Sequence, residues 1–143
     1  MSNAERLIQA LDDVFTDSEV VVDQALIDRM IERIGSIAAD DVETVMTGTD
    51  ETFTTTRQGQ DGMREAWADW LGTFQSIRFE IEDVAQMGGN VLTLGRQVGV
   101  TRHGGVELEQ PSAAVWKFRD AELVRVEFHL DREKAEASAA EPA

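Results

Sequence analysis

Four consecutive stretches with a two-residue alternation constrain the fold more than any other feature of this sequence. Apolar and polar residues alternate through 77–87, 90–101, 106–118 and 122–130, which is the period of a β-strand with one buried face. The connectors GGN, RHGG and RDA are short and rich in turn residues. Because short connectors join antiparallel neighbours, this half of the chain predicts an antiparallel meander.

Helical periodicity dominates the sequence before these strands. Ser2 and Glu5 have the spacing of a capping box at the start of a first apolar stripe. Asp23 can cap a second helix, and a third, with two of the three tryptophans on its stripe, is capped near Asp61. Asp131 can cap a short final helix. Helices first and long strands after indicate an α+β fold with a strongly curved sheet.

The segment between the second and third helices favours short strands. Residues 42–56 are rich in threonine, and Gly48 and Asp50 suggest a turn within them. We expect a single domain over residues 1–137, which is long enough to bury a core without disulfides. Residues 138–143 are expected to form a flexible tail.

Composition excludes several classes of function. The formal net charge is −15, from 28 acidic and 13 basic residues, which disfavours nucleic acid and anionic membranes as partners. Cysteine is absent, so neither disulfides nor thiolate chemistry is expected. With no long apolar run and no basic leader, we expect a cytoplasmic protein without a membrane span.

Arg96 is the residue that the strand pattern does not explain. Side chains of a strand alternate between its faces, and Arg96 falls in the apolar row of the second long strand. A buried arginine needs an acidic partner or a wet cavity. A bulge near Gly95 or Gly99 is an alternative that would turn Arg96 to solvent. The apolar row that contains Arg96 comprises Leu92, Leu94, Arg96, Val98 and Val100.

The second half of the chain resembles SnoaL-like proteins of the nuclear transport factor 2 (NTF2-like) superfamily. The resemblance spans residues 56–137 and rests on a Gly-x-x-Gly-x-x-x-x-Trp entry to the third helix, on GVELEQP, and on VEFHLDREKA. It implies a cone, in which a bent sheet wraps around helices and leaves a pocket, commonly in a homodimer. Ketosteroid isomerases, limonene epoxide hydrolases and polyketide cyclases share this fold, so the fold alone decides no reaction.

The cone implied by this resemblance identifies candidate pocket residues. In such a cone the apolar row of each strand faces the pocket, which selects Phe128 in the last strand. In the preceding strand Trp116 shares its row with Gln110, provided that Pro111 causes no shift. Aromatic residues in such positions are more often plain core residues than part of a ligand site. The candidate ligand-binding residues are Arg96, Trp67, Trp70, Gln110, Trp116 and Phe128.

The catalytic set of limonene epoxide hydrolases is incomplete in this sequence. The resemblance implies an Arg and an Asp two residues apart on one strand and a second Asp on the last strand. Arg96 matches the Arg, but Val98 and Phe128 stand where the two carboxylates would be. Epoxide hydrolysis by that route is therefore not expected.

The other two chemistries of the family fit incompletely as well. Ketosteroid isomerisation uses a carboxylate base and a neutral acid or phenol; the chain has no tyrosine, and Glu43 and Thr44 match the base position equally well. Polyketide cyclases use an acid and usually a histidine, whereas strand parity turns His129 and Asp131 outward. His103 and His129 lack the convergence of a metal site, so neither a metal nor another cofactor is expected.

Two functions remain open from the sequence. A mostly apolar pocket with Arg96 at its floor predicts binding of a small hydrophobic molecule bearing a carboxylate or carbonyl, with isomerase- or cyclase-like proton transfer as a possible activity. The alternative is a non-catalytic dimeric structural or interaction domain with a side-chain-filled cavity. In it Arg96 is neutralised within the chain, by Glu43, Glu80, Glu107, Glu109 or a glutamate across the sheet. We expect a homodimer through the convex sheet face, with Arg125 and Glu127 meeting across a two-fold axis.

Overall fold

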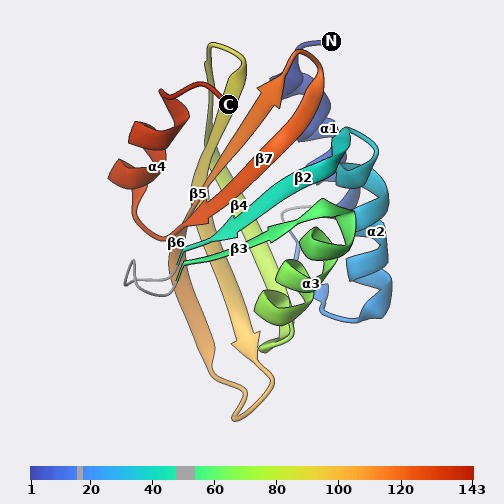
Figure 1. Ribbon diagram of the computed structural model, residues 1–143. Coiled ribbons are helices and arrows are strands. Elements are labelled where there is room, and N and C mark those ends of the chain that lie inside the picture. Colours follow the sequence, from blue (N-terminus) through green and yellow to red (C-terminus); the bar gives the residue numbers. More distant parts are fainter. Residues whose placement is uncertain (16–17, 48–53) are drawn as a thin grey trace.

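The computed structural model describes residues 1–15, 18–47 and 54–143. Four helices and seven strands lie within them (Figure 1). The predicted turn at Gly48 and Asp50 lies outside the described residues. In chain order the elements are α1 (Asn3–Val14), β1 (Val20–Val21), α2 (Gln24–Gly35), β2 (Ala38–Met46), β3 (Thr55–Gln58), α3 (Gly59–Leu71), β4 (Phe74–Met87), β5 (Asn90–Thr101), β6 (Glu107–Arg119), β7 (Glu122–His129) and α4 (Arg132–Ala139).

All seven strands belong to one curved sheet with the order β1-β4-β5-β6-β7-β2-β3. Strands β4 to β7 form the predicted antiparallel meander. Strand β2 pairs in parallel with β7, a long-range pairing that the sequence did not reveal. Helices α1, α2 and α3 lie on one side of the sheet and α4 lies on the other (Figure 1). The predicted α+β cone is confirmed, and we call the α1–α3 side concave and the α4 side convex.

Local capping signals determine most of the helix starts. The Ser2 hydroxyl accepts a hydrogen bond from the backbone N–H of Glu5 at 3.0 Å, and the Glu5 carboxylate accepts one from the Ser2 backbone. Asp23 and Asp131 cap α2 and α4 as predicted. The predicted cap of α3 was wrong: this helix begins at Gly59 without a side-chain cap, and Asp61 lies inside its first turn.

Strand β4 carries a bulge opposite Gly95 of β5. Ile81 pairs with Gly95 and Asp83 with Leu94, so Glu82 is an extra residue in β4. A side chain at Gly95 would overlap the carbonyl oxygen of Glu80. Glycine is therefore required at this close approach of two backbones.

Both faces of the sheet are covered by helices. The larger core lies on the concave side between the sheet and α1–α3. A smaller core lies on the convex side, where Ala135 and Ala139 of α4 pack against the sheet residues Leu92, Ala113 and Val115. Although the sequence predicted a tail from residue 138, α4 continues through Ala139, whose exposed fraction is only 1%.

Candidate functional site

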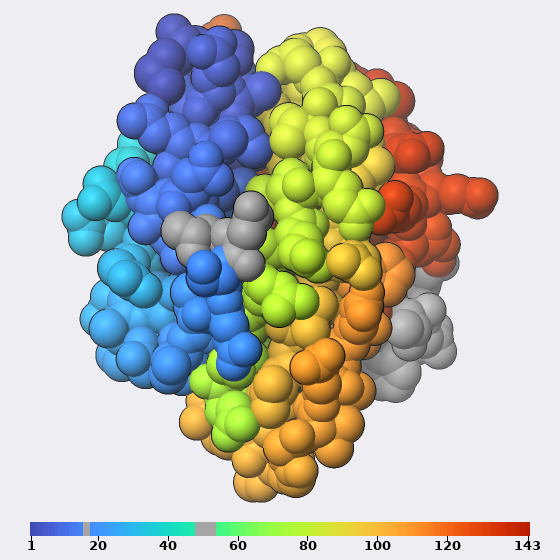
Figure 2. Space-filling view, turned by 180° about the vertical axis from the view of Figure 1, so that it is seen from behind, coloured from blue at the N-terminus to red at the C-terminus, as the bar shows by residue number. Residues whose placement is uncertain are grey.

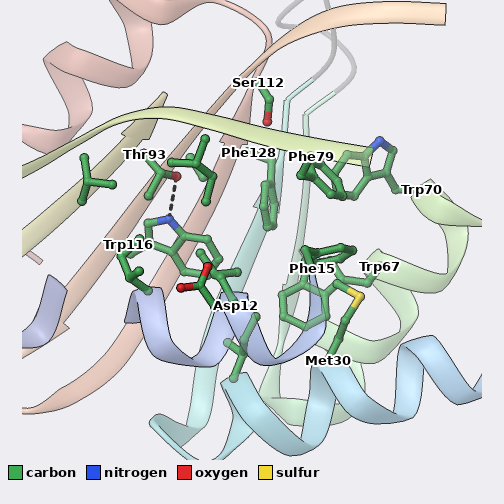
Figure 3. Close-up of a pocket in the computed structure, with 16 residues that line it drawn as sticks. Asp12, Phe15, Met30, Trp67, Trp70, Phe79, Thr93, Ser112, Trp116 and Phe128 are labelled. Carbon is green, nitrogen blue, oxygen red and sulfur yellow. Dashed lines mark hydrogen bonds between the residues drawn. The ribbon is translucent and has the colours of Figure 1, made fainter. Parts of the chain in front are cut away.

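A cavity of about 280 Å³ lies between the concave face of the sheet and helices α1–α3 (Figure 3). Asp12 of α1 is exposed, and Ile81 and Val84 of β4 keep 42% and 37% of their surface exposed while lining the cavity. The cavity therefore opens between α1 and β4, which lie side by side in Figure 2. Its lining residues are Ile8, Leu11, Asp12, Phe15, Met30, Ile34, Trp67, Trp70, Phe79, Ile81, Val84, Thr93, Ser112, Ala114, Trp116 and Phe128.

Six aromatic rings lie in the wall of the cavity. Phe128 lies at the centre, with the rings of Trp70, Trp116 and Trp67 at centroid distances of 5.4, 5.8 and 6.3 Å. Phe79 extends this cluster toward the mouth, 5.6 Å from the ring of Trp70. Phe15 completes it, 4.7 Å from Phe79. Six of the nine aromatic residues of the chain thus surround one cavity.

Few polar groups reach this space. The indole Nε1 of Trp116 donates a hydrogen bond to Oγ1 of Thr93 at 3.1 Å. Figure 3 shows the hydroxyl of Ser112 directed toward the space between the rings, whereas Asp12 is exposed at the mouth. Within the described part of the chain, the buried Nε1 of Trp67 has no hydrogen-bond partner. The cavity can therefore satisfy only a few polar atoms of a bound molecule.

Asp12 is the one ionisable residue among the described residues that line the cavity. It follows Ile8 by four residues, so these two lie on one face of α1, and Phe15 caps the end of this helix. Among the described residues, no ion pair involves Asp12, whereas its neighbour Asp13 lies 3.8 Å from Arg33. No lysine, arginine or histidine occurs among the described residues that line the cavity. The sequence pattern contained this signal, because Asp12 interrupts the apolar stripe of α1.

The structure brings together four of the six predicted ligand-binding residues. Trp67, Trp70, Trp116 and Phe128 all line the cavity. Gln110 lies on the same sheet face but in an adjoining hollow, where its Oε1 accepts a hydrogen bond from Nε2 of Gln97 at 2.8 Å. The pairing of β5 with β6 runs without a shift through Pro111, so the predicted row of β6 is confirmed.

The predicted position of Arg96 was wrong. It lies on the convex face, where 45% of its side chain is exposed. Its guanidinium contacts Glu80 at 2.8 Å, Glu82 at 3.3 Å and also Glu109. The charges of Glu109 and then Glu80 raise the pKa of Arg96 above its ordinary value. The internal-pairing alternative therefore describes Arg96, with Glu80 and Glu109 among the partners it proposed.

The reason for this error is the second core under α4. The apolar residues Leu92 and Leu94 pack there, so the apolar row of β5 faces away from the cavity. The row toward the cavity contains Thr93 and two glycines, of which Gly99 is covered by the ring of Phe74. No bulge in β5 is involved, since its residues pair consecutively with those of β4 and β6.

The convex face carries a network of charges within one chain. Arg125 donates a hydrogen bond from Nε to Glu127 at 2.7 Å and also pairs with Glu43. Both contacts lie within one chain, and the pairing of Arg125 with Glu127 across a two-fold axis stays a prediction. Glu43 therefore points away from the cavity, and Thr44 occupies the concave row beside Val126.

Glu127 is the centre of this network and is only 4% exposed. Its carboxylate accepts a hydrogen bond from the Ser138 hydroxyl at 2.7 Å and lies 2.9 Å from Nε2 of His129. Burial raises the pKa of Glu127, but the hydrogen bonds from His129, Ser138 and Arg125 outweigh it and lower that pKa to about 2. The network fastens α4 to the sheet and lies outside the cavity.

Comparison with protein families identifies this architecture. The model of the SnoaL-like domain matches residues 19–126. The chain belongs to the SnoaL-like domain family. A search of curated proteins gives no match, and no helix in the described residues is long and apolar enough to cross a membrane.

Solved structures share the fold of this SnoaL-like chain at low sequence identity. TerC, co-crystallised with polyporic acid, has a TM-score of 0.68 at 20% identity, covering 97% of this chain and 98% of TerC. A proposed SnoaL-like polyketide cyclase from Jannaschia sp. CCS1 has a TM-score of 0.69 at 13% identity, covering 99% of this chain and 93% of the Jannaschia chain. A hypothetical protein with a ketosteroid isomerase-like fold from Catenulispora acidiphila DSM 44928, in complex with trimethylamine, has a TM-score of 0.64 at 14% identity, covering 96% and 94%.

Proposed function

We propose that this SnoaL-like protein binds a small, predominantly apolar molecule in the cavity between its helices and its sheet. The observation that carries this proposal is the open cavity of about 280 Å³ with six aromatic rings in its wall. Small-molecule sites are concave, mostly apolar and furnished with a few polar groups. The Ser112 hydroxyl and the Asp12 carboxylate are such groups. Arg96 was expected to select an anionic ligand. Its guanidinium lies on the sheet face opposite the cavity, so the proposed ligand is apolar and needs no negative charge.

Binding is better supported than a proton-transfer reaction. Isomerase- or cyclase-like chemistry needs a carboxylate base and a second group that stabilises the oxyanion. Asp12 is exposed at the mouth, where water solvates its charge, and the strand position of the isomerase base carries Thr44. The open cavity also disfavours a purely structural domain, because such a domain is expected to fill this space with side chains. TerC with polyporic acid and the Catenulispora protein with trimethylamine further support a binding role.

A thermal-shift screen tests this proposal. The purified protein is heated with steroids, polyketide-like aromatics and apolar carboxylic acids, beside the variant Ala114→Phe, whose new ring would occupy the cavity. Binding should raise Tm by several degrees in the wild type and not in the variant. Arg96→Leu is the matched control on the opposite face and should keep the shift. Should Ala114→Phe fail to fold, Ser112→Leu replaces it.

Two outcomes would contradict a small-molecule function. One is the absence of a shift with every compound. The other is a shift that survives cavity filling but disappears in Arg96→Leu, which would place binding on the convex face.

A further inference from the structure

We infer that the cavity selects an organic ammonium ion whose nitrogen carries apolar substituents. This inference rests on the proposed function and names the ligand class for the same site. It follows from the walls of the cavity, from the charge at its mouth and from the absence of a counter-charge for anions among its described residues.

The walls provide a surface that attracts cations. The face of an aromatic ring carries negative charge density, and cations bind against it within about 6 Å of the ring centroid. Trp70, Trp116 and Trp67 surround Phe128 with mostly edge or tilted geometries. Several ring faces can therefore contact the alkyl groups of one ammonium ion, as in the aromatic cages that bind quaternary amines.

The charge at the mouth favours the same class of ligand. Asp12 lines the cavity, and no ion pair among the described residues neutralises it. An ammonium group held between the rings can lie close to this carboxylate while its apolar substituents stay inside. The formal net charge of −15 adds a general attraction for cations.

Other ligand classes find less complementarity. A carboxylate inside the cavity would meet Asp12 and no cationic side chain among the described lining residues, and burying an unpaired charge is costly. A neutral ketone would find the Ser112 hydroxyl but would gain nothing from Asp12. The combination of aromatic walls with one unpaired carboxylate is specific to a cation.

A pair of isosteric probes tests the inference. Benzyltrimethylammonium and neopentylbenzene have the same shape and differ in the charge of one central atom. Binding of each is measured by titration calorimetry or tryptophan fluorescence, since three tryptophans line the cavity. We expect the cation to bind at least about tenfold more tightly than the neutral probe. Phenylacetate is the anionic comparison and should bind most weakly.

Two variants separate the effect of the Asp12 charge at the mouth from the effect of the net charge of the protein. Asp12→Asn should lower the affinity for the cation by about five- to tenfold. The affinity for the neutral probe should stay within about twofold of the wild-type value. Asp13→Asn removes the same charge from the adjacent, outward position and should leave both affinities nearly unchanged. Equal losses in the two variants would mean that only the net charge acts, which would overturn a role for Asp12.

The outcomes also distinguish this inference from the proposed function. If neopentylbenzene bound as tightly as benzyltrimethylammonium, or more tightly, the inference would be overturned. The proposed apolar binding cavity would still stand. Failure of both probes, with ligands found in the broader screen, would likewise reject the ammonium class alone. Failure of both probes and of the entire screen would reject the proposed function too.

Discussion

The Nη2 atom of Arg96 lies 2.8 Å from Oε2 of Glu80, on the face of the sheet opposite the cavity. Arg96→Leu should therefore leave ligand binding unchanged. The substitution leaves Glu80, Glu82 and Glu109 close together without their cation. Because these side chains are between 31% and 51% exposed, water screens their charges, and we expect only a small decrease in Tm, about 1–3 °C, measured by calorimetry.

The salt dependence of this effect provides the control. Added salt screens repulsion among exposed carboxylates, so the difference between wild type and Arg96→Leu should shrink as ionic strength rises. A variant that fails to fold at any salt concentration would show instead that the pairing is essential to the sheet.

Glu127 should control the acid stability of the protein. Its pKa is about 2, against an ordinary value of 4.5, so the folded state holds the ionised form more strongly than the unfolded chain does. This contribution is complete above about pH 4.5 and is lost as the pH falls toward 2. Lys117 is 5% exposed, and its Nζ lies 3.9 Å from Oε2 of Glu127. Glu127→Gln removes this acidic partner and should cost about 3 kcal/mol at pH 7. Urea unfolding as a function of pH measures both effects.

The matched control lies in the same strand. Glu122 is exposed at the start of β7, and Glu122→Gln should change stability little at any pH. If Glu127→Gln lost stability between pH 5 and pH 2 as steeply as the wild type, Glu127 would not be the responsible group.

Gly95 should be irreplaceable opposite the bulge of β4. A Cβ there would overlap the carbonyl oxygen of Glu80, and backbone cannot move aside as a flexible side chain can. We expect Gly95→Ala to cost about 1–3 kcal/mol in chemical unfolding. Gly89→Ala is the control, because a Cβ at that position would lie at ordinary contact distance, 3.6 Å from the carbonyl oxygen of Phe118. Equal effects of the two substitutions would remove the close approach as the reason for glycine.

Local signals made much of the fold predictable. The predicted second strand, 90–101, has the observed bounds of β5, because strict alternation and turn residues at both ends define a strand without long-range information. Ser2, Asp23 and Asp131 marked helix starts for the same reason. The parallel pairing of β2 with β7 was not predictable, since it joins residues far apart in the sequence.

The residues of the candidate site were predictable only on helices and strands that bury a single face. Trp67 and Trp70 lie on an amphipathic helix with a single apolar side, and they line the cavity. Strand β5 has two covered faces, because Ala135 and Ala139 of α4 bury Leu92 on the convex side. Alternation then fixes which residues share a face but not which face holds the cavity. Arg96 was misplaced for this reason.

The last residues of the chain should contribute to stability. The amide of Asn90 donates hydrogen bonds to the carbonyls of Ala139 at 3.2 Å and Glu141 at 2.7 Å, and Ser138 donates one to Glu127. Deleting residues 138–143 removes these contacts and the burial of Ala139. We expect a loss of about 2–3 kcal/mol in urea unfolding at pH 7.

The same deletion should also raise the pKa of Glu127, because the Ser138 hydroxyl is one of the donors that lower it. Acid unfolding should then begin at a higher pH in the truncated protein than in the full chain. Deleting only residues 142–143 removes neither Ser138 nor the Asn90 contacts and serves as the control, with stability and acid midpoint close to those of the full chain. If the longer deletion behaved like the shorter one, residues 138–143 would contribute nothing to stability, as expected of the flexible tail that the sequence predicted, and α4 would be held by Ala135 and the Asp131 cap alone.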